Sequence, residues 1–238
     1  MKIAIAGKQF NIPLNRLSVS RQVEFRLLSK YLDLSPSEVL CDIGCGDGFW
    51  TSRFVKTTNC RAFGIDLNFN RLRDADQNGY ETVSFAKGDI QVLPYGSSKF
   101  DKIVSVCVLE HVDDDIQALK EMRRVLKKDG VLALTVDSFS YPGTSSALKE
   151  HHRIKYHVVN YYSYDSLKEK LLSSGFEPCE HQFITSSAIS RYFYELYISH
   201  RKFSYFLFPL AYPLSLFADW LRGNVGHGFK LAVKARAV

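Results

Sequence analysis

The chain lacks most of the signals that would place a protein outside the cytoplasm or on nucleic acid. None of its five cysteines forms a C-x-x-C pair, which counts against a structural metal site and favours a reducing compartment. No run of Arg and Lys exceeds two residues, so the net charge of +6 indicates a solvated basic face. The first residues show no charged segment followed by an apolar one, as a secretory signal would. We therefore expect a cytoplasmic protein that binds neither nucleic acid nor a structural metal.

Apolar segments alternate with amphipathic ones along most of the chain. At 238 residues and 46% hydrophobic content, it is long enough for one large α/β domain with an insertion. We expect strands at 39–43, 61–66, 82–86, 102–108, 131–137, 176–185 and 228–237. We expect helices at 48–57, 68–77, 114–126 and 164–174, and an N-terminal helix that starts near Ser18 or Ser20 and leans over the ligand cleft. This order predicts a doubly wound α/β sheet with helices on both faces.

The most informative stretch follows the first predicted strand directly. There the chain reads Asp42-x-Gly44-x-Gly46-x-Gly48 and enters a helical pattern, which predicts a ligand cleft at the carboxyl edge of the sheet. Glycines allow positive φ and let a ligand approach the backbone. The dinucleotide fingerprint G-x-G-x-x-G would need a glycine where Phe49 stands, and the Asp42 carboxylate would repel phosphate. The loop instead suits a cationic ligand that carries an amino group.

In this form the loop resembles the first motif of the class I S-adenosylmethionine (SAM) dependent methyltransferases, of the small-molecule type with a methyltransferase-11-like domain. The segment from Phe100 to His111 resembles the same family, and the likeness covers roughly residues 35–180. It implies SAM as the methyl donor and a Rossmann-like, doubly wound sheet of seven strands, mostly parallel with an antiparallel last strand. It says little about the substrate, because this fold serves many acceptors.

Carboxylates follow the next two predicted strands. Asp66, 24 positions after Asp42, can accept hydrogen bonds from both ribose hydroxyls of an adenosine, a spacing that fits SAM and NAD equally. Asp89 can accept from an adenine amino group while Ile90 packs on the base, or it forms a tight turn. Asp47 either contacts the amino acid part of SAM or caps the following helix. The predicted cofactor-binding residues are Asp42, Gly44, Cys45, Gly46, Asp66, Leu67, Asp89, Ile90 and Cys107.

Histidines are the predicted proton acceptors. A hydroxyl acceptor loses its proton as the new bond forms, and histidine suits that role near neutral pH. His111 follows the fourth predicted strand, and His152 and His157 lie in a long loop beyond Asp137, whose side chain we expect to face the crevice. Each histidine also has a noncatalytic interpretation. In that case His111 would orient the following loop or pack under the cofactor. His152 and His157 would be surface residues or would bond to the backbone. The acidic run at 113–115 predicts a helix cap, and no metal is expected.

Residues 186–227 separate the last two predicted strands, where an ordinary connection has about six residues. The segment is dense in aromatics, and its stretch 203–221 is nearly as long as a membrane span, but Pro209 and Pro213 would break an uninterrupted helix. A span would also separate the last strand from its sheet. Basic side chains flank the stretch at Arg191, Arg201, Lys202 and Arg222. This pattern favours peripheral contact with an anionic bilayer, and a cap on the protein's own core and a homodimer interface are the alternatives.

These features predict a single domain over residues 1–238. Within it we expect an N-terminal cap segment at 1–34, a SAM-binding core at 35–137, a substrate-side loop and helix at 138–175 and the apolar insertion at 186–227. The leading interpretation is a cytoplasmic SAM-dependent methyltransferase that O-methylates a lipophilic or membrane-proximal acceptor, such as an isoprenoid, a lipid-linked glycan or a phenol. We then expect the insertion to contact the inner face of the membrane peripherally. A noncatalytic SAM- or lipid-binding module is the alternative, and an NAD-dependent oxidoreductase is a weaker one.

Overall fold

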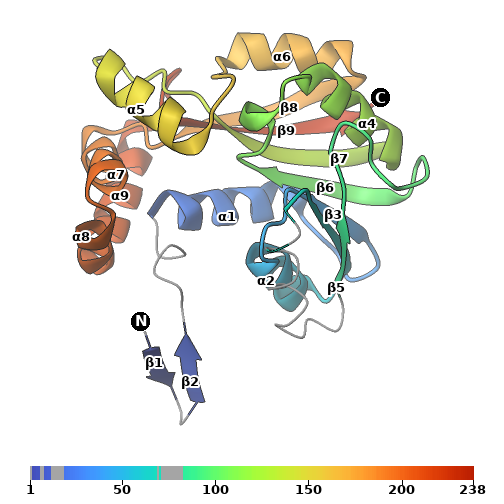
Figure 1. The fold of residues 1–238 in the computed structure, drawn as a ribbon, viewed down its shortest axis with the longest axis horizontal. Coiled ribbons are helices and arrows are strands. Elements are labelled where there is room, and N and C mark those ends of the chain that lie inside the picture. The colour runs from blue at the N-terminus through green and yellow to red at the C-terminus, as the bar shows by residue number, and fades with distance from the viewer. Residues whose placement is uncertain (1, 6–7, 12–18, 69, 71–82) are drawn as a thin grey trace.

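The computed structural model describes residues 2–5, 8–11, 19–68, 70 and 83–238, and its main feature is a seven-stranded sheet (Figure 1). The strands are β3 (Val39–Ile43), β4 (Arg61–Asp66), β5 (Val83–Lys87), β6 (Phe100–Val106), β7 (Leu126–Asp137), β8 (Phe176–Ile184) and β9 (Lys230–Ala237). Their order is β5-β4-β3-β6-β7-β9-β8. Strand β9 runs antiparallel to both of its neighbours, and the other pairs are parallel. The predicted doubly wound sheet with an antiparallel last strand is therefore confirmed.

Helices cover both faces of this sheet (Figure 1). They are α1 (Val19–Leu32), α2 (Phe49–Thr58), the short 3-10 turn η2 (Leu109–His111), α4 (Asp115–Val125), α5 (Ser146–Tyr156) and α6 (Tyr164–Ser173). Helices α1 and α2 share one hydrophobic core with the sheet, and α4 and α6 share another. Strand β3 serves both, because successive side chains of a strand point to opposite faces. Leu40 belongs to the core of α1 and α2, whereas Cys41 and Ile43 belong to that of α4 and α6.

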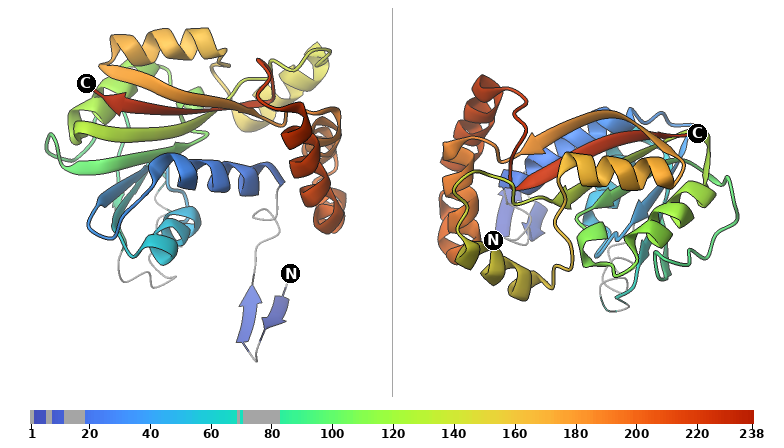
Figure 2. Two further views of the ribbon diagram at one scale, coloured as in Figure 1. Left: turned by 180° about the vertical axis from the view of Figure 1, so that it is seen from behind. Right: turned by 90° about the horizontal axis from the view of Figure 1, so that it is seen from above.

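The segment between β8 and β9 forms helices α7 (Ala188–Ser199), α8 (Arg201–Phe206) and α9 (Phe208–Arg222), which stand together at one end of the sheet (Figure 2). The inner face of α7 packs on the protein's own core, where Tyr194 clusters with Phe139 and Phe229. Pro209 lies in the first turn of α9, where proline is tolerated. The helix continues through Pro213, so the break predicted there is wrong, and the interruption falls between α8 and α9. None of the described helices is long and apolar enough to span a membrane.

Several predicted boundaries shift by a few residues. Strand β7 begins at Leu126, earlier than predicted, because its first residue already pairs with Phe100 at the start of β6. The predicted cap of α4 is confirmed, since the carboxylate of Asp114 accepts a hydrogen bond from the N–H of Gln117 (2.9 Å). Ser18 and most of the helix predicted at 68–77 lie outside the described residues. Strands β1 (Lys2–Ile5) and β2 (Lys8–Asn11) form a separate antiparallel hairpin.

Candidate cofactor and acceptor site

The glycine loop between β3 and α2 is shaped by backbone conformations that side chains disfavour. Gly44, Gly46 and Gly48 have φ values of 78°, 58° and 69°. The N–H groups of Gly44 and Cys45 both donate to the carbonyl oxygen of Ile65 at the end of β4, at 2.8 and 3.0 Å. These bonds hold the loop against the neighbouring strand. The loop therefore presents bare backbone at the carboxyl edge of the sheet, as the sequence predicted.

Gly44 is also required by its neighbour in the fold. A Cβ built on Gly44 would lie 2.2 Å from Cγ2 of Val108, in the segment that leaves β6. Real side chains do not approach so closely, so a larger residue would push the two segments apart. This contact brings the glycine loop directly beside the exit of β6.

Asp66 connects the loop to the end of β4. Its carboxylate is nearly buried, with 8% of the residue exposed. One oxygen accepts the N–H of Gly46 and the other accepts the N–H of Asn68, each at 2.8 Å. Each carboxylate oxygen keeps capacity for a further donor, such as a ribose hydroxyl. Leu67 beside it is 64% exposed, so this edge can receive a ligand.

Asp42 lies underneath the loop. It is 3% exposed, and its carboxylate accepts a hydrogen bond from the hydroxyl of Thr51 in α2 (2.5 Å). Burial, helped by the nearby charge of Asp66 and opposed by the Thr51 hydrogen bond, raises the pKa of Asp42 to about 7. Asp42 thus joins β3 to α2 directly, and contact with the amino group of a ligand stays a prediction.

The remaining predicted cofactor residues fall beside Asp66 but are engaged in local turns. Asp89 is exposed, and its carboxylate accepts the backbone N–H of Gln91 (2.9 Å), the bond expected of the turn interpretation. Ile90 is 7% exposed and belongs to the hydrophobic core. The carboxylate of Asp47 accepts the N–H of Phe49 (3.3 Å), the first residue of α2. Neither Asp47 interpretation is decided by this bond.

A second site, here called the charged pocket, lies next to the loop at the ends of β6, β7 and β9. Its lining residues come from elements far apart in the sequence, and they include Arg21 of α1, Cys107, Glu110 and His111 after β6, Asp137 of β7, His152 of α5 and Lys230 of β9. Cys107 has a φ of 53°, a value uncommon for a residue with a side chain. The pocket therefore forms only when the whole sheet has assembled.

One wall of the charged pocket is a buried ion cluster around Glu24. The carboxylate of Glu24, 1% exposed, accepts hydrogen bonds from Lys230 Nζ and from Arg21 Nη1, the latter at 3.0 Å. Lys230 Nζ also lies 3.2 Å from the sulfur of Cys107. Burial disfavours the charged carboxylate, but attraction to Lys230 and Arg21 outweighs it and lowers the pKa of Glu24. The cluster ties helix α1 to strand β9.

The charged pocket also contains two carboxyl groups, Glu110 and Asp137, to which no Lys or Arg of the described residues is bonded. Glu110 is 0% exposed and neither of its carboxyl oxygens has a hydrogen-bond partner in the described part of the chain. Asp137 is 5% exposed. Burial raises the pKa of both groups, and the charge of Asp137 raises that of Glu110 further.

These carboxyl groups also lie near a thiol. One carboxyl oxygen of Glu110, one of Asp137 and the sulfur of Cys107 all lie within 4.8 Å of one another. Such a donor set can bind a cation, so the predicted absence of a metal stays a prediction.

The three predicted catalytic histidines separate in the structure. His152 is on α5, within the long loop of the prediction, and burial lowers its pKa to about 3, so its ring is neutral. Its Nδ1 lies 3.1 Å from the hydroxyl of Tyr161, and its Nε2 lies 3.7 Å from the carboxylate of Asp137. His111 also lines the charged pocket, and its Nδ1 lies 3.2 Å from the carbonyl oxygen of His157. The exposed ring of His157 is not among the pocket's lining residues.

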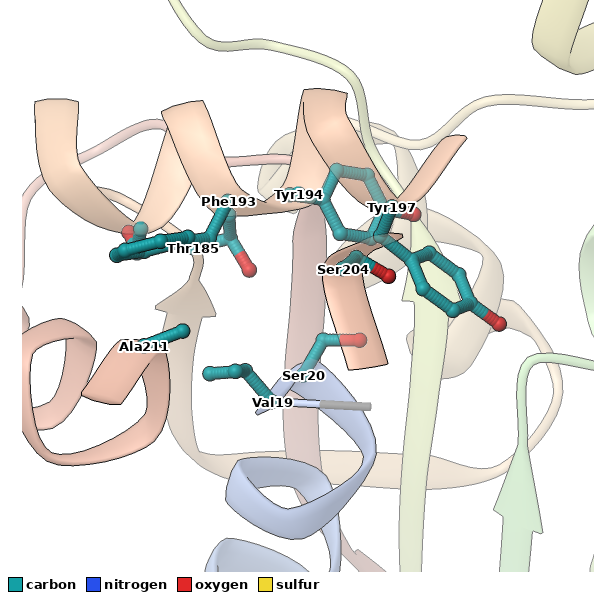
Figure 3. Close-up of a pocket in the computed structure, with 9 residues that line it drawn as sticks. Val19, Ser20, Thr185, Phe193, Tyr194, Tyr197, Ser204 and Ala211 are labelled. Carbon is teal, nitrogen blue, oxygen red and sulfur yellow. The ribbon is translucent and has the colours of Figure 1, made fainter. Parts of the chain in front are cut away.

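An apolar pocket adjoins the charged one (Figure 3). It lies between the start of α1 and the insertion helices, and is lined by Val19, Ser20, Thr185, Ser190, Phe193, Tyr194, Tyr197, Ser204 and Ala211. Ser20, Tyr194 and Tyr197 line both pockets. A molecule with a polar end and an apolar body could therefore lie across the two.

Sequence reasoning missed the ion cluster and the carboxyl Glu110. The available signals were weak: Lys230 stands inside a predicted buried strand, and Glu24 stands among the apolar residues of the N-terminal helix. Glu110 directly precedes His111, in the segment that carried the family resemblance. Only the fold shows that these positions meet.

Comparison with known proteins gives this geometry a context. The family model described as "Methyltransferase domain" matches residues 41–134. The chain is 31% identical over 112 residues to Methyltransferase GfsG of Streptomyces halstedii, covering 45% of this chain and 40% of that protein. It is 28% identical over 159 residues to 27-O-demethylrifamycin SV methyltransferase of Amycolatopsis mediterranei (strain S699), covering 63% and 58%. The chain thus spans about half the length of these curated relatives.

Among solved structures, the fold resembles geranyl diphosphate C-methyltransferase from Streptomyces coelicolor A3(2), in complex with Mg²⁺, geranyl-S-thiolodiphosphate and S-adenosyl-L-homocysteine. The TM-score is 0.70 at 15% identity, and the match covers 92% of this chain and 76% of that one. At this identity the likeness bears on the fold alone.

Proposed function

We propose that the chain is a class I SAM-dependent methyltransferase that transfers the methyl group of SAM to a lipophilic small molecule, a proposal that the methyltransferase-domain match over residues 41–134 supports. The observation that carries this proposal is the union of two pockets beside the glycine loop. The charged pocket at the strand ends shares Ser20, Tyr194 and Tyr197 with the apolar pocket under the insertion. A polar and a largely apolar binding surface therefore lie side by side.

The residues of the loop fit SAM. The Asp66 carboxylate has capacity for ribose hydroxyls, and the backbone from Gly44 to Gly46 has no Cβ at two of its three positions. Asp89 lies beside Asp66, since the N–H of the preceding Gly88 donates to the backbone carbonyl of Asp66 (3.2 Å). When bound, SAM supplies an electrophilic methyl group. The protein's task is to hold the acceptor in line with it and to exclude water.

For O-methylation we assign His111 as the proton acceptor. A carbonyl oxygen can only accept, so the bond to His157 places the proton of His111 on Nδ1 and leaves Nε2 free to accept one. His111 lines the charged pocket, whereas His152 is buried beside Asp137 and serves better to position that carboxylate.

The histidine assignment has a matched test within the chain. His111→Gln should lower kcat by about 100-fold or more, the usual contribution of a general base. His157→Gln should leave kcat nearly unchanged, because only the backbone carbonyl of His157 takes part. Equal losses in both variants, or none in His111→Gln, would contradict the assignment. The measurement is formation of S-adenosylhomocysteine at saturating SAM.

We further propose that the insertion meets a membrane surface. Its outer face exposes large apolar side chains: Tyr192, Phe203, Phe206, Leu210, Leu214, Phe217, Trp220 and Leu221. Between Phe203 and Leu221 the only acidic or basic side chain is Asp219. Its carboxylate accepts from the N–H of Ser187 (2.8 Å) and the hydroxyl of Ser190 (2.7 Å), so it is occupied within the protein. An uncharged aromatic face of this kind suits a bilayer interface.

Liposome flotation tests this contact. The double variant Phe206→Ser/Trp220→Ser removes two of the most exposed apolar groups, at 81% and 73%, and should reduce flotation with anionic vesicles by about tenfold. Leu172→Ser, on α6 and 53% exposed, is the matched control and should float like the wild type, because α6 lies away from the insertion helices (Figure 1). Equal flotation of all three proteins would contradict membrane contact, and a concentration-dependent dimer lost in the double variant would assign this face to self-association.

Turnover separates the proposal from a noncatalytic binding module. The wild-type protein should form S-adenosylhomocysteine from SAM when a cell lipid extract is added, and should form little without it. SAM binding with no product above background in the presence of the extract would favour the binding module.

A further inference from the structure

We infer that the charged pocket takes the head group of the acceptor, and that this head carries a hydrogen-bond donor, a hydroxyl or an amine, directed at Glu110 and Asp137. The apolar remainder of the molecule then extends into the pocket under the insertion. The inference rests on the proposed function, because it names the class of molecule that the same site takes.

Glu110 provides the first argument. A carboxyl group that is 0% exposed and has no partner for either oxygen among the described residues is rare, because buried polar groups are almost always hydrogen-bonded. Its position is well fixed, since its backbone carbonyl accepts the N–H groups of Val159 and Asn160 at 2.8 and 3.1 Å. A fixed, unbonded carboxyl that lines a pocket indicates that a ligand supplies the missing donor.

Asp137 provides the second argument. An oxygen of Asp137 and one of Glu110 lie within 4.8 Å of each other, so a single hydroxyl or amine placed between them can reach both. The two basic side chains that line the pocket, Arg21 and Lys230, are bonded to Glu24. Nε2 of His152 lies 3.7 Å from the Asp137 carboxylate, on a ring that is neutral near pH 7.

The same arrangement disfavours an anionic head. A phosphate or carboxylate between Glu110 and Asp137 would add a third acidic group beside two buried ones to which no Lys or Arg of the described residues is bonded, since Lys230 and Arg21 are bonded to Glu24. A neutral hydroxyl adds no charge, and a protonated amine offsets the carboxylate charge. The pair therefore selects for donors and against anions.

The apolar pocket beside the charged one provides the third argument. Tyr194 and Tyr197 of α7 and Ser20 of α1 line both pockets, and Figure 3 shows them in the apolar one, so we expect a chain that leaves the head group to follow these residues. Beyond them the lining is largely apolar, with Val19, Phe193 and Ala211. The acceptor is thus an amphiphile with a donor head and an apolar tail.

Simple octyl probes test this without the natural acceptor. Calorimetric titration of the full-length chain, with S-adenosylhomocysteine present, should show octylamine and 1-octanol binding at least about tenfold more tightly than octanoate, the effect of one charged hydrogen bond or more. Butylamine should bind more weakly than octylamine, because less apolar surface is buried. Equal binding of octanoate and octylamine would overturn the inference, and so would equal binding of the two amines.

Variants locate the head group. Glu110→Gln and Asp137→Asn keep the shape of each side chain and should each weaken octylamine by about tenfold. Asp165→Asn, an exposed carboxylate on α6, is the matched control and should change nothing. Unchanged affinity for S-adenosylhomocysteine shows that each variant is folded. Octylamine binding that both pocket variants leave intact would overturn the inference, as would tight binding of Mg²⁺ or Zn²⁺ that Glu110→Gln abolishes.

The outcome is separable from that of the proposed function. Probe discrimination at Glu110 without turnover on any lipid extract would leave the inference standing and refute the methyltransferase activity. Turnover on the extract without probe discrimination would support the methyltransferase activity and refute the inference about the head group.

Discussion

The glycine loop and the charged pocket lie side by side at the carboxyl edge of one sheet, yet they are built in opposite ways. The loop is a continuous stretch of chain whose contacts are made mainly by backbone N–H groups and one carboxylate. The pocket gathers side chains from α1, the segment after β6, β7, α5, α7 and β9, and buries several charges. The first site depends on local conformation, and the second depends on the whole fold.

This difference teaches where each kind of specificity comes from. A loop held by positive-φ glycines is compatible with one cofactor and many acceptors. The charged pocket has a high cost of desolvation, which its partners offset for Glu24 but not for Glu110. We therefore place acceptor recognition in the pocket, and we expect changes there to affect folding as well as binding.

The largest expected effect is in the ion cluster. Lys230→Met should lower the free energy of unfolding by about 3 kcal/mol, because it leaves the buried Glu24 carboxylate with Arg21 and the weakly donating thiol of Cys107 as its partners among the described residues. Adding Glu24→Gln should recover most of that loss, since the unpaired charge is gone. Urea unfolding measures both. If Lys230→Met/Glu24→Gln has the same free energy of unfolding as Lys230→Met alone, Lys230 and Glu24 do not stabilise each other.

A slightly smaller effect is expected at the loop, and it should appear in binding. Asp66→Ala should weaken SAM about 100-fold, or about 2.7 kcal/mol, because it removes the partner of Gly46 and Asn68 together with the expected ribose contact. Asp89→Asn should cost less than about fivefold, since Asp89 is exposed and bonded within its own turn. Calorimetric titration with SAM measures the affinity of both variants. Loss of affinity in Asp89→Asn alone would reverse the roles of the two carboxylates.

The smallest expected effect is a pH dependence that belongs to the loop. Burial raises the pKa of Asp42 to about 7 in the folded protein, above its unfolded value of about 3.9, so the folded state holds a proton that the unfolded state has released. The stability associated with Asp42 is present below about pH 4 and is lost as the pH rises towards 7. The wild type should therefore lose about 1 to 2 kcal/mol relative to Asp42→Asn between pH 5 and pH 7. Urea unfolding curves of the two proteins that stay parallel over this range would contradict the shift.

Much of the loop could be predicted from the sequence because its signals are local. The spacing of the glycines after an apolar strand predicted the turn, and Asp66 was found by its distance from Asp42 along the chain. The doubly wound sheet followed from the alternation of elements, and the antiparallel β9 followed from the family resemblance.

The pocket could not be predicted in the same way. His111 and Asp137 were expected near the crevice because they end strands, but His157 was expected there for its position in a loop and contributes only a carbonyl. Lys230 and Glu24 are 206 positions apart, and no local pattern relates them. Contacts of that kind follow from the packing of α1 against β9, which sequence periodicity does not specify.

Transfer of tritium from [methyl-³H]SAM to an organic-extractable product tests the central claim most directly. With a cell lipid extract as the source of acceptor, the wild-type protein should place label in the organic phase, and Asp66→Ala should stay at background. Label at background with the wild type, under conditions where it binds SAM, would contradict the account.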